Sequence, residues 1–176
     1  MTSQCSAVAL LLLATPVAAG PRDDARPLFN TAVTTFHSGD VRGARTAIAR
    51  AVATDASWPL ALAMQWRIAI ATRDGAFAEA RLHAAWQKGY PHRNLRHLFA
   101  HAFLLQGRAD AALAEASFAD IPVRYAAYAA RMRAAAHVAL GQRDAANRDL
   151  AAAARLAPND SFVWSDIARW RLAGGD

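Results

Sequence analysis

The chain of 176 residues is poor in several residue types on which folds and reactions depend. Its single cysteine, Cys5, excludes an internal disulfide and any cysteine-based metal cluster. Its 7 prolines and 9 glycines are too few for a disordered or collagen-like chain. Only 19% of the residues are charged while 55% are hydrophobic, so the chain can bury a core.

Alanine dominates what is present, with 47 of the 176 positions. Because alanine loses the least free energy on entering a helix, and β-branched runs are sparse, the composition predicts an all-α fold. Arginine supplies 19 residues and lysine one, and the formal net charge is +6. This charge suits anionic partners, although an arginine bias alone is a weak signal of function.

The first nineteen residues read as a secretory signal peptide. An apolar run spans residues 7–14 and is followed by Pro16 and by small residues at Val17 and Ala19, which predicts cleavage after Ala19. The run is too short to remain as a stable transmembrane anchor. Residues 1–6 contain no lysine or arginine, so either the positive end of the signal peptide is minimal or the true start lies upstream. The alternative interpretation of the segment is a hydrophobic N-terminal helix. We expect a bacterial periplasmic or secreted protein whose mature chain covers residues 20–176.

Helix-breaking residues recur at regular intervals along this mature chain, which is the strongest signal in the sequence. Proline is tolerated in the first turn of a helix and glycine just past its end, so the pattern predicts helices in consecutive pairs. The glycines are Gly39, Gly75, Gly107, Gly141 and Gly175, and the prolines are Pro27, Pro59, Pro91, Pro122 and Pro158. First helices are predicted near 25–38, 58–73, 91–106, 121–140 and 159–173, and second helices near 41–54, 76–88, 108–118 and 143–156.

This period of about 34 residues with two helices per unit resembles the tetratricopeptide repeat. In the clearest unit Ala146, Leu150, Ala153 and Pro158 stand at the second-helix spacings of that family. The segment that begins at Trp164 then reproduces its first-helix signature of tryptophan, two residues, an aliphatic residue and a small residue. Small residues recur in first helices (Ala32, Ala100, Ala134, Ala168, with Ile68 out of pattern) and in second helices (Ala44, Ala80, Ala112, Ala146).

The resemblance implies a right-handed superhelical array of antiparallel helix pairs, with about four repeats and a C-terminal capping helix whose outer face is polar. It also implies that the first helices line a concave groove that binds partner proteins or peptides. The first four first-helix segments carry arginines and no acidic residue, so we expect a basic groove. The inward positions that the family's register implies are Arg26, Phe29, His37, Gln65, Arg73, Asn94, His97, His101, Tyr128, Arg131 and Arg169.

Sites for chemistry are weakly supported, so we expect no enzyme and no cofactor. His97 and His101 stand four residues apart on one helical face, but no third ligand is near in sequence and Leu98 replaces the glutamate of a zinc protease motif. We therefore expect no metal site, and read the pair as packed or groove-lining histidines. No Gly-x-Ser-x-Gly elbow and no phosphate-binding glycine loop occurs. The five tryptophans are interpreted as packing residues.

Three functional hypotheses remain. The first is an exported adaptor or scaffold that binds a partner protein or peptide, acidic in character, in the basic groove. The second is a structural component of a larger cell-envelope assembly or a self-associating homo-oligomer. The third, nucleic-acid binding through the net charge, conflicts with the signal peptide, and we expect no nucleic-acid partner.

Overall fold

The computed structural model describes residues 20–117 and 119–174, and in these residues it contains nine α-helices, one short 3₁₀ helix and no strand. The predicted signal peptide, residues 1–19, lies outside the described residues, as does Gly175. None of the helices in the described part is long and apolar enough to cross a membrane. The helices are α1 (Pro21–His37), α2 (Val41–Thr54), α3 (Pro59–Ala71), α4 (Gly75–Gln87), η1 (His92–Asn94), α5 (Arg96–Leu105), α6 (Ala109–Ala116), α7 (Val123–Ala139), α8 (Arg143–Leu156) and α9 (Ser161–Leu172).

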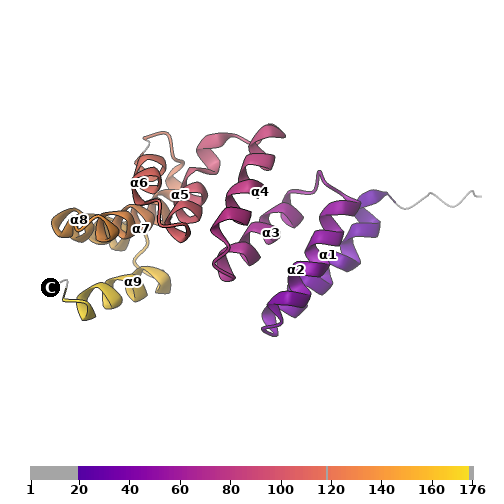
Figure 1. Ribbon diagram of the computed structural model, residues 1–176, viewed down its shortest axis with the longest axis horizontal. Helices are drawn as coiled ribbons and strands as arrows, with labels where there is room; N and C mark the ends of the chain where they lie inside the picture. The colour runs from indigo at the N-terminus through magenta and orange to yellow at the C-terminus, as the bar shows by residue number, and fades with distance from the viewer. Residues whose placement is uncertain (1–19, 118, 175–176) are drawn as a thin grey trace, which may run out of the picture.

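The helices form an elongated array in chain order, with α1 and α2 at one end and α8 and α9 at the other (Figure 1). Each helix packs against its neighbours in the sequence, and α5 also packs against α7. The predicted all-α class and the predicted succession of helix pairs are therefore confirmed. Two second helices, α2 and α8, have the boundaries that the sequence predicts.

The helices repeat with a period of exactly 34 residues, which is tighter than the spacings of the glycines. The second helices begin at Val41, Gly75, Ala109 and Arg143. The first helices of the same four pairs end at His37, Ala71, Leu105 and Ala139. The turn between them contains one residue with positive φ in each pair: Gly39, Arg73, Gly107 and Gly141.

The predicted role of Gly75 as a turn residue is wrong. Arg73 occupies the left-handed turn position with φ of 56°, and Gly75 begins α4 two residues later. A Cβ on Gly75 would lie 2.6 Å from the Ala102 carbonyl oxygen and 2.8 Å from the Leu105 Cβ. This glycine therefore lets α4 approach α5 closely, a packing requirement that the sequence pattern did not separate from a turn.

The same shift of two residues affects one predicted packing alanine. Ala80 is exposed, whereas Ala78 is fully buried and stands 34 residues from both Ala44 and Ala112. Ala44, Ala112 and Ala146 are fully buried as predicted. A small side chain at this position removes the bulk that would hold two helices apart, so neighbouring helices can pack at short distance.

The first helix begins earlier than predicted, at Pro21. Pro21 occupies the first-turn position that the sequence pattern predicts for Pro27, and Pro27 lies inside the helix. Asp23 and Asp24 consequently fall in the first turn of α1, where acidic side chains interact favourably with the helix dipole. The expected absence of acidic residues from the first helices is therefore wrong for α1.

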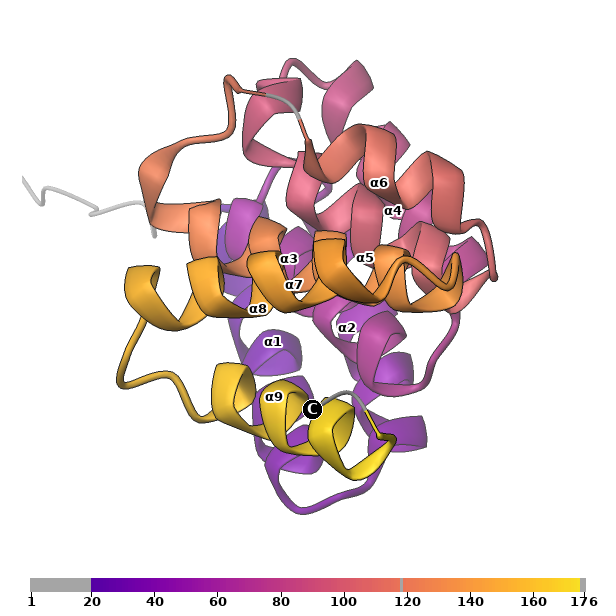
Figure 2. The same ribbon diagram turned by 90° about the vertical axis from the view of Figure 1, so that its left-hand side faces the viewer.

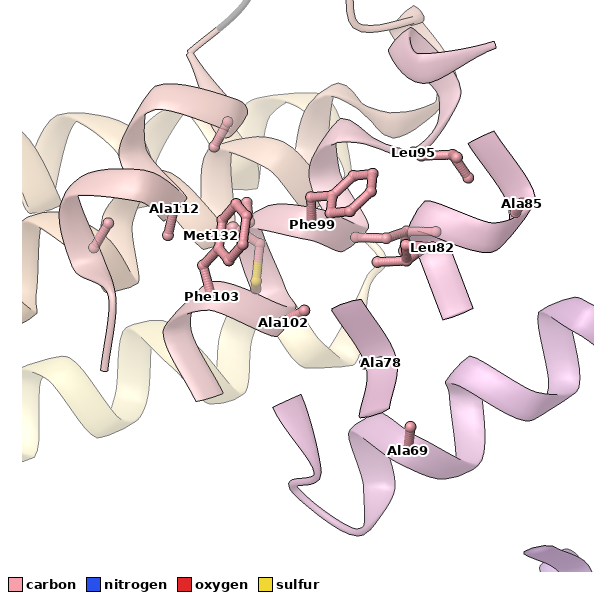
Figure 3. Packing of buried hydrophobic residues seen from close by; sticks show 14 residues of the cluster. Ala69, Ala78, Leu82, Ala85, Leu95, Phe99, Ala102, Phe103, Ala112 and Met132 are labelled. Atoms are coloured by element: carbon pink, nitrogen blue, oxygen red, sulfur yellow. The ribbon is translucent and has the colours of Figure 1, made fainter. Parts of the chain in front are cut away.

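The hydrophobic core becomes thinner toward the C-terminal end. Its largest cluster joins α3 to α7 around Phe99, Phe103 and Leu82, with alanines filling the close contacts (Figure 3). A second cluster joins α1, α2 and α3 around Ile48 and Met64. The cluster at α7, α8 and α9 has only three buried members, Ala130, Ala153 and Val163.

The last helix does not have the polar outer face expected of a capping helix. On α9 the exposed fractions are 50% for Trp164 and 88% for Leu172. In the view along the array α9 lies apart from α7 and α8 over much of its length (Figure 2). Asp166 of α9, a charged residue, does not lie on this outer face but pairs with Arg131 of α7.

Candidate functional site

Two adjoining hollows lie on the face of the array formed by the odd-numbered helices. The larger, of about 610 Å³, is lined by residues of α1, α3, α5, α7 and α9. The smaller, of about 470 Å³, lies on α3, α5, α7 and α9 and on the turn after α3. They share four lining residues, Ile70, His101, Arg131 and Phe162, and together we call them the inner groove.

The structure brings seven of the eleven predicted site residues together in this groove. They come from α1, α5, α7, α9 and the turn after α3, which is the first-helix face that the repeat pattern implied. The seven are Phe29, His37, Arg73, His101, Tyr128, Arg131 and Arg169.

The other four predicted residues line neither hollow. Gln65 and His97 are buried, with exposed fractions of 5% and 4%. The His97 ring stacks on Tyr125 with 4.2 Å between the ring centroids. Arg26 is exposed in the second turn of α1 and pairs with Asp23 at 2.9 Å. Asn94 belongs to the 3₁₀ turn before α5.

Most of the apolar lining of the groove and one of its arginines were not predicted from the sequence. Leu60 and Phe162 are 61% and 66% exposed and line the larger hollow with Met64 and Trp66. Arg67 lines the same hollow. The 34-residue period could have identified Arg67, because it places one residue of each odd-numbered helix at the same position in the groove. These residues are Val33, Arg67, His101, Ala135 and Arg169.

The two predicted site histidines, His97 and His101, add no positive charge at neutral pH. Burial lowers the pKa of His97 to about 4 and the pKa of His101 to about 4, so both rings are neutral at pH 7. Burial raises the pKa of Tyr128 to about 12, so its phenol keeps its proton. The Tyr128 hydroxyl lies 2.5 Å from Nδ1 of His101, where it can donate to the unprotonated ring nitrogen.

Arg131 joins α7 to α9 through an ion pair. Its Nε lies 2.6 Å from Asp166 of α9, and only 10% of the Arg131 side chain is exposed. Asp166 also accepts from Arg169 at 2.5 Å, so one carboxylate joins two guanidiniums. The predicted role of Arg131 as an accessible binding charge is therefore replaced by a role in fastening α9 to α7.

Arg67 and Arg73 are the exposed groove arginines that have no ion-pair partner in the described residues, whereas exposed Arg169 pairs with Asp166. The four lining arginines with the single carboxylate of Asp166 leave the groove with three positive charges. The expected basic character of the groove therefore comes from its arginines.

The groove holds no arrangement for binding a metal through the two histidines. His101 uses Nδ1 toward Tyr128, and Nδ1 of His97 is buried without a hydrogen-bond partner. In the described part of the chain no cluster of three or more histidine, cysteine or acidic residues is placed to hold an ion.

No family model, curated protein or solved structure matches the chain.

Proposed function

We propose that this chain is an exported interaction module, similar to tetratricopeptide-repeat proteins, that binds a peptide segment of a partner protein in the inner groove. The 34-residue recurrence of helix starts supports a repeat array, and a right-handed superhelix is the arrangement that the resemblance implies. The proposed role is binding without catalysis and without a cofactor.

One observation carries the proposal: accessible arginines stand beside exposed apolar side chains in a hollow face. Leu60 and Phe162 lose contact with water only if something occupies the groove. Burying such side chains contributes about 25 cal/mol per Å² of apolar area. Arg67 and Arg73 offer guanidinium forks that match carboxylates.

The occupant that fits is an acidic peptide with an aromatic or large aliphatic anchor. The anchor would pack between Phe29 and Tyr128, which line the larger hollow from α1 and α7. Carboxylates on either side of it would pair with Arg67 and Arg73. Because the hollows extend over four or five helices, an extended segment fits their length better than a compact ligand.

Export is the part of the proposal that depends on the sequence alone. If the signal peptide is removed after Ala19, the exported protein begins at Gly20. Intact mass of the chain recovered from the periplasm of an expressing bacterium measures this start. A chain found in the envelope fraction with Met1 in place would contradict it.

Selection from a random peptide-display library, using the purified chain as bait, tests the binding proposal. Selected peptides should combine aspartate or glutamate with an aromatic residue. Synthetic copies, measured by fluorescence anisotropy, should bind the Arg67→Glu variant at least tenfold more weakly than the parent chain. They should also bind less tightly as salt is raised, because exposed charges are screened within about 8 Å at physiological ionic strength.

Arg148→Glu is the matched control, because Arg148 is an exposed arginine on α8 that lines neither hollow of the groove. It changes the net charge by the same amount and should leave peptide affinity nearly unchanged. Peptides without acidic residues, or equal weakening by the two variants, would contradict the proposed groove function.

A further inference from the structure

The outer face of α9 is an uncovered position in a repeat whose other four first helices are covered. In each of those pairs a second helix follows the first and packs on it: α2 on α1, α4 on α3, α6 on α5 and α8 on α7. In the described residues no helix stands in that relation to α9. A hollow of about 550 Å³ lies there between α8 and α9.

The 34-residue period identifies the residues of α9 that a second helix would contact. Ala130 of α7 belongs to the same cluster as Ala153 of α8, and Ala134 is 1% exposed. The equivalent residues of α9 are Trp164, which is 50% exposed, and Ala168, which is exposed. Ala168 therefore has the small side chain needed for close helix approach but has no helix against it.

The nearest pair, α7 and α8, indicates which charge a covering helix would carry. The second helices of the last two pairs carry a carboxylate at equivalent positions, whereas α2 has Ala47 there and α4 has Arg81. Glu115 of α6 pairs with Arg96 at 3.0 Å, and Asp149 of α8 pairs with Arg133 at 2.5 Å. Asp149 also lies 3.4 Å from His137. The residue of α9 equivalent to His137 is Arg171, which is exposed and forms no ion pair within the described chain.

We propose that α9 is a second interaction surface, which binds an amphipathic helix of a partner protein in the position that α8 has on α7. The helix carries a small residue, an acidic residue three positions later and a large aliphatic residue directly after it, as Ala146, Asp149 and Leu150 do in α8. The acid pairs with Arg171, and the apolar ridge fills the hollow beside Trp164 and Ile167.

The test uses a synthetic peptide of residues 142–157, acetylated, amidated and labelled with a fluorophore, as the probe. It should bind the purified chain saturably in an anisotropy titration. Ala168→Gln should abolish binding, because it adds a long neutral side chain at the point of closest approach while keeping a good helix former. Arg67→Glu and Arg148→Glu should leave binding unchanged, which separates this surface from the inner groove.

A charge exchange tests the predicted ion pair. Arg171→Glu in the protein should weaken the parent peptide at least tenfold, and a peptide with Asp149→Arg should recover most of the affinity for that variant. Recovery requires that the two positions meet. Weakening by Arg171→Glu without recovery by the exchanged peptide would overturn the proposed register.

A second arm covers the marginal stability of a short isolated helix in water. The same segment is appended to the full chain through a flexible linker, which raises its effective concentration to the millimolar range. The appended helix should raise Tm and shift tryptophan emission to the blue, and Ala168→Gln should remove both effects. No binding in either arm overturns the proposal, and so does a dimer in light scattering that Ala168→Gln dissociates.

Discussion

Replacing Arg73 with glycine should stabilise the protein and weaken peptide binding at the same time. Arg73 is the one non-glycine residue with positive φ in the described chain, at 56°, and three glycines hold the equivalent turn positions. A left-handed backbone costs a residue with a Cβ roughly 1–2 kcal/mol. Arg73→Gly releases that strain, but it also raises the conformational entropy of the unfolded chain, which lowers the free energy of unfolding by about 0.4–1 kcal/mol. A net gain of about 0.5–1 kcal/mol remains.

For a chain of this size such a gain raises Tm by roughly 1–4 °C. Calorimetry and urea unfolding measure the change, with two controls. Arg73→Ala keeps the Cβ and should give little of the gain. Arg67→Gly places the same substitution inside α3, where glycine costs about 1 kcal/mol. A fall in Tm for Arg73→Gly, or an equal gain for Arg73→Ala, would refute the strain argument.

The binding consequence follows from the position of Arg73 on the smaller hollow. Both Arg73→Gly and Arg73→Ala remove the guanidinium, so both should weaken the selected acidic peptides to a similar extent. A stabilised variant with reduced affinity would mean that the strained turn places a binding charge at a cost in stability, as strained residues at functional sites do. Unchanged affinity in both variants would remove Arg73 from the groove's function.

Three further outcomes are expected. Gly75→Ala should cost about 1–3 kcal/mol in urea unfolding because its Cβ meets the α5 backbone at 2.6 Å, whereas Ala109→Gly at the equivalent helix start should cost 1 kcal/mol or less; a neutral Gly75→Ala would contradict that contact. The free energy of unfolding, and with it Tm, should fall as pH drops from 6.5 toward 4, because in this range the unfolded chain binds protons at His97 and His101 that the buried rings of the folded chain do not bind. The free energy should fall by up to about 1.4 kcal/mol per pH unit for each ring. His97→Phe should reduce this slope, and a flat profile would contradict the buried neutral rings. Asp166→Asn should destabilise by about 1–3 kcal/mol, since it leaves largely buried Arg131 unpaired, and peptide affinity should hold or rise with the added positive charge; loss of affinity with folding intact would contradict the assigned charges.

The helix succession could be predicted because its signals are local. Apolar spacing and breaker residues place α2 and α8 at their observed boundaries. Positions that depend on contacts between helices could not be placed. Gly75 allows the close approach of α4 to α5, and Arg73 occupies the turn position that glycine has in the other pairs. A pattern based on glycines therefore places this turn two residues too late.

The groove face could be predicted from the repeat, but its chemistry could not. Burial decides that His101 is neutral, and no sequence pattern reports how deeply a ring lies in the array. The Arg131 pairing depends on Asp166, which lies 35 residues away on α9. Leu60 and Phe162 were missed because apolar residues in a helix are expected in the core, and only the structure shows them exposed.

The most direct test of the account is an NMR spectrum of the five tryptophan indole N–H groups during titration with a selected acidic peptide. Trp66 lines the inner groove, whereas Trp164 lies on the outer side of α9. If peptides bind in the inner groove, the peptide should shift the Trp66 signal and leave the Trp164 signal in place. A shift of Trp164 without a shift of Trp66 would contradict the claim that peptides bind in the inner groove.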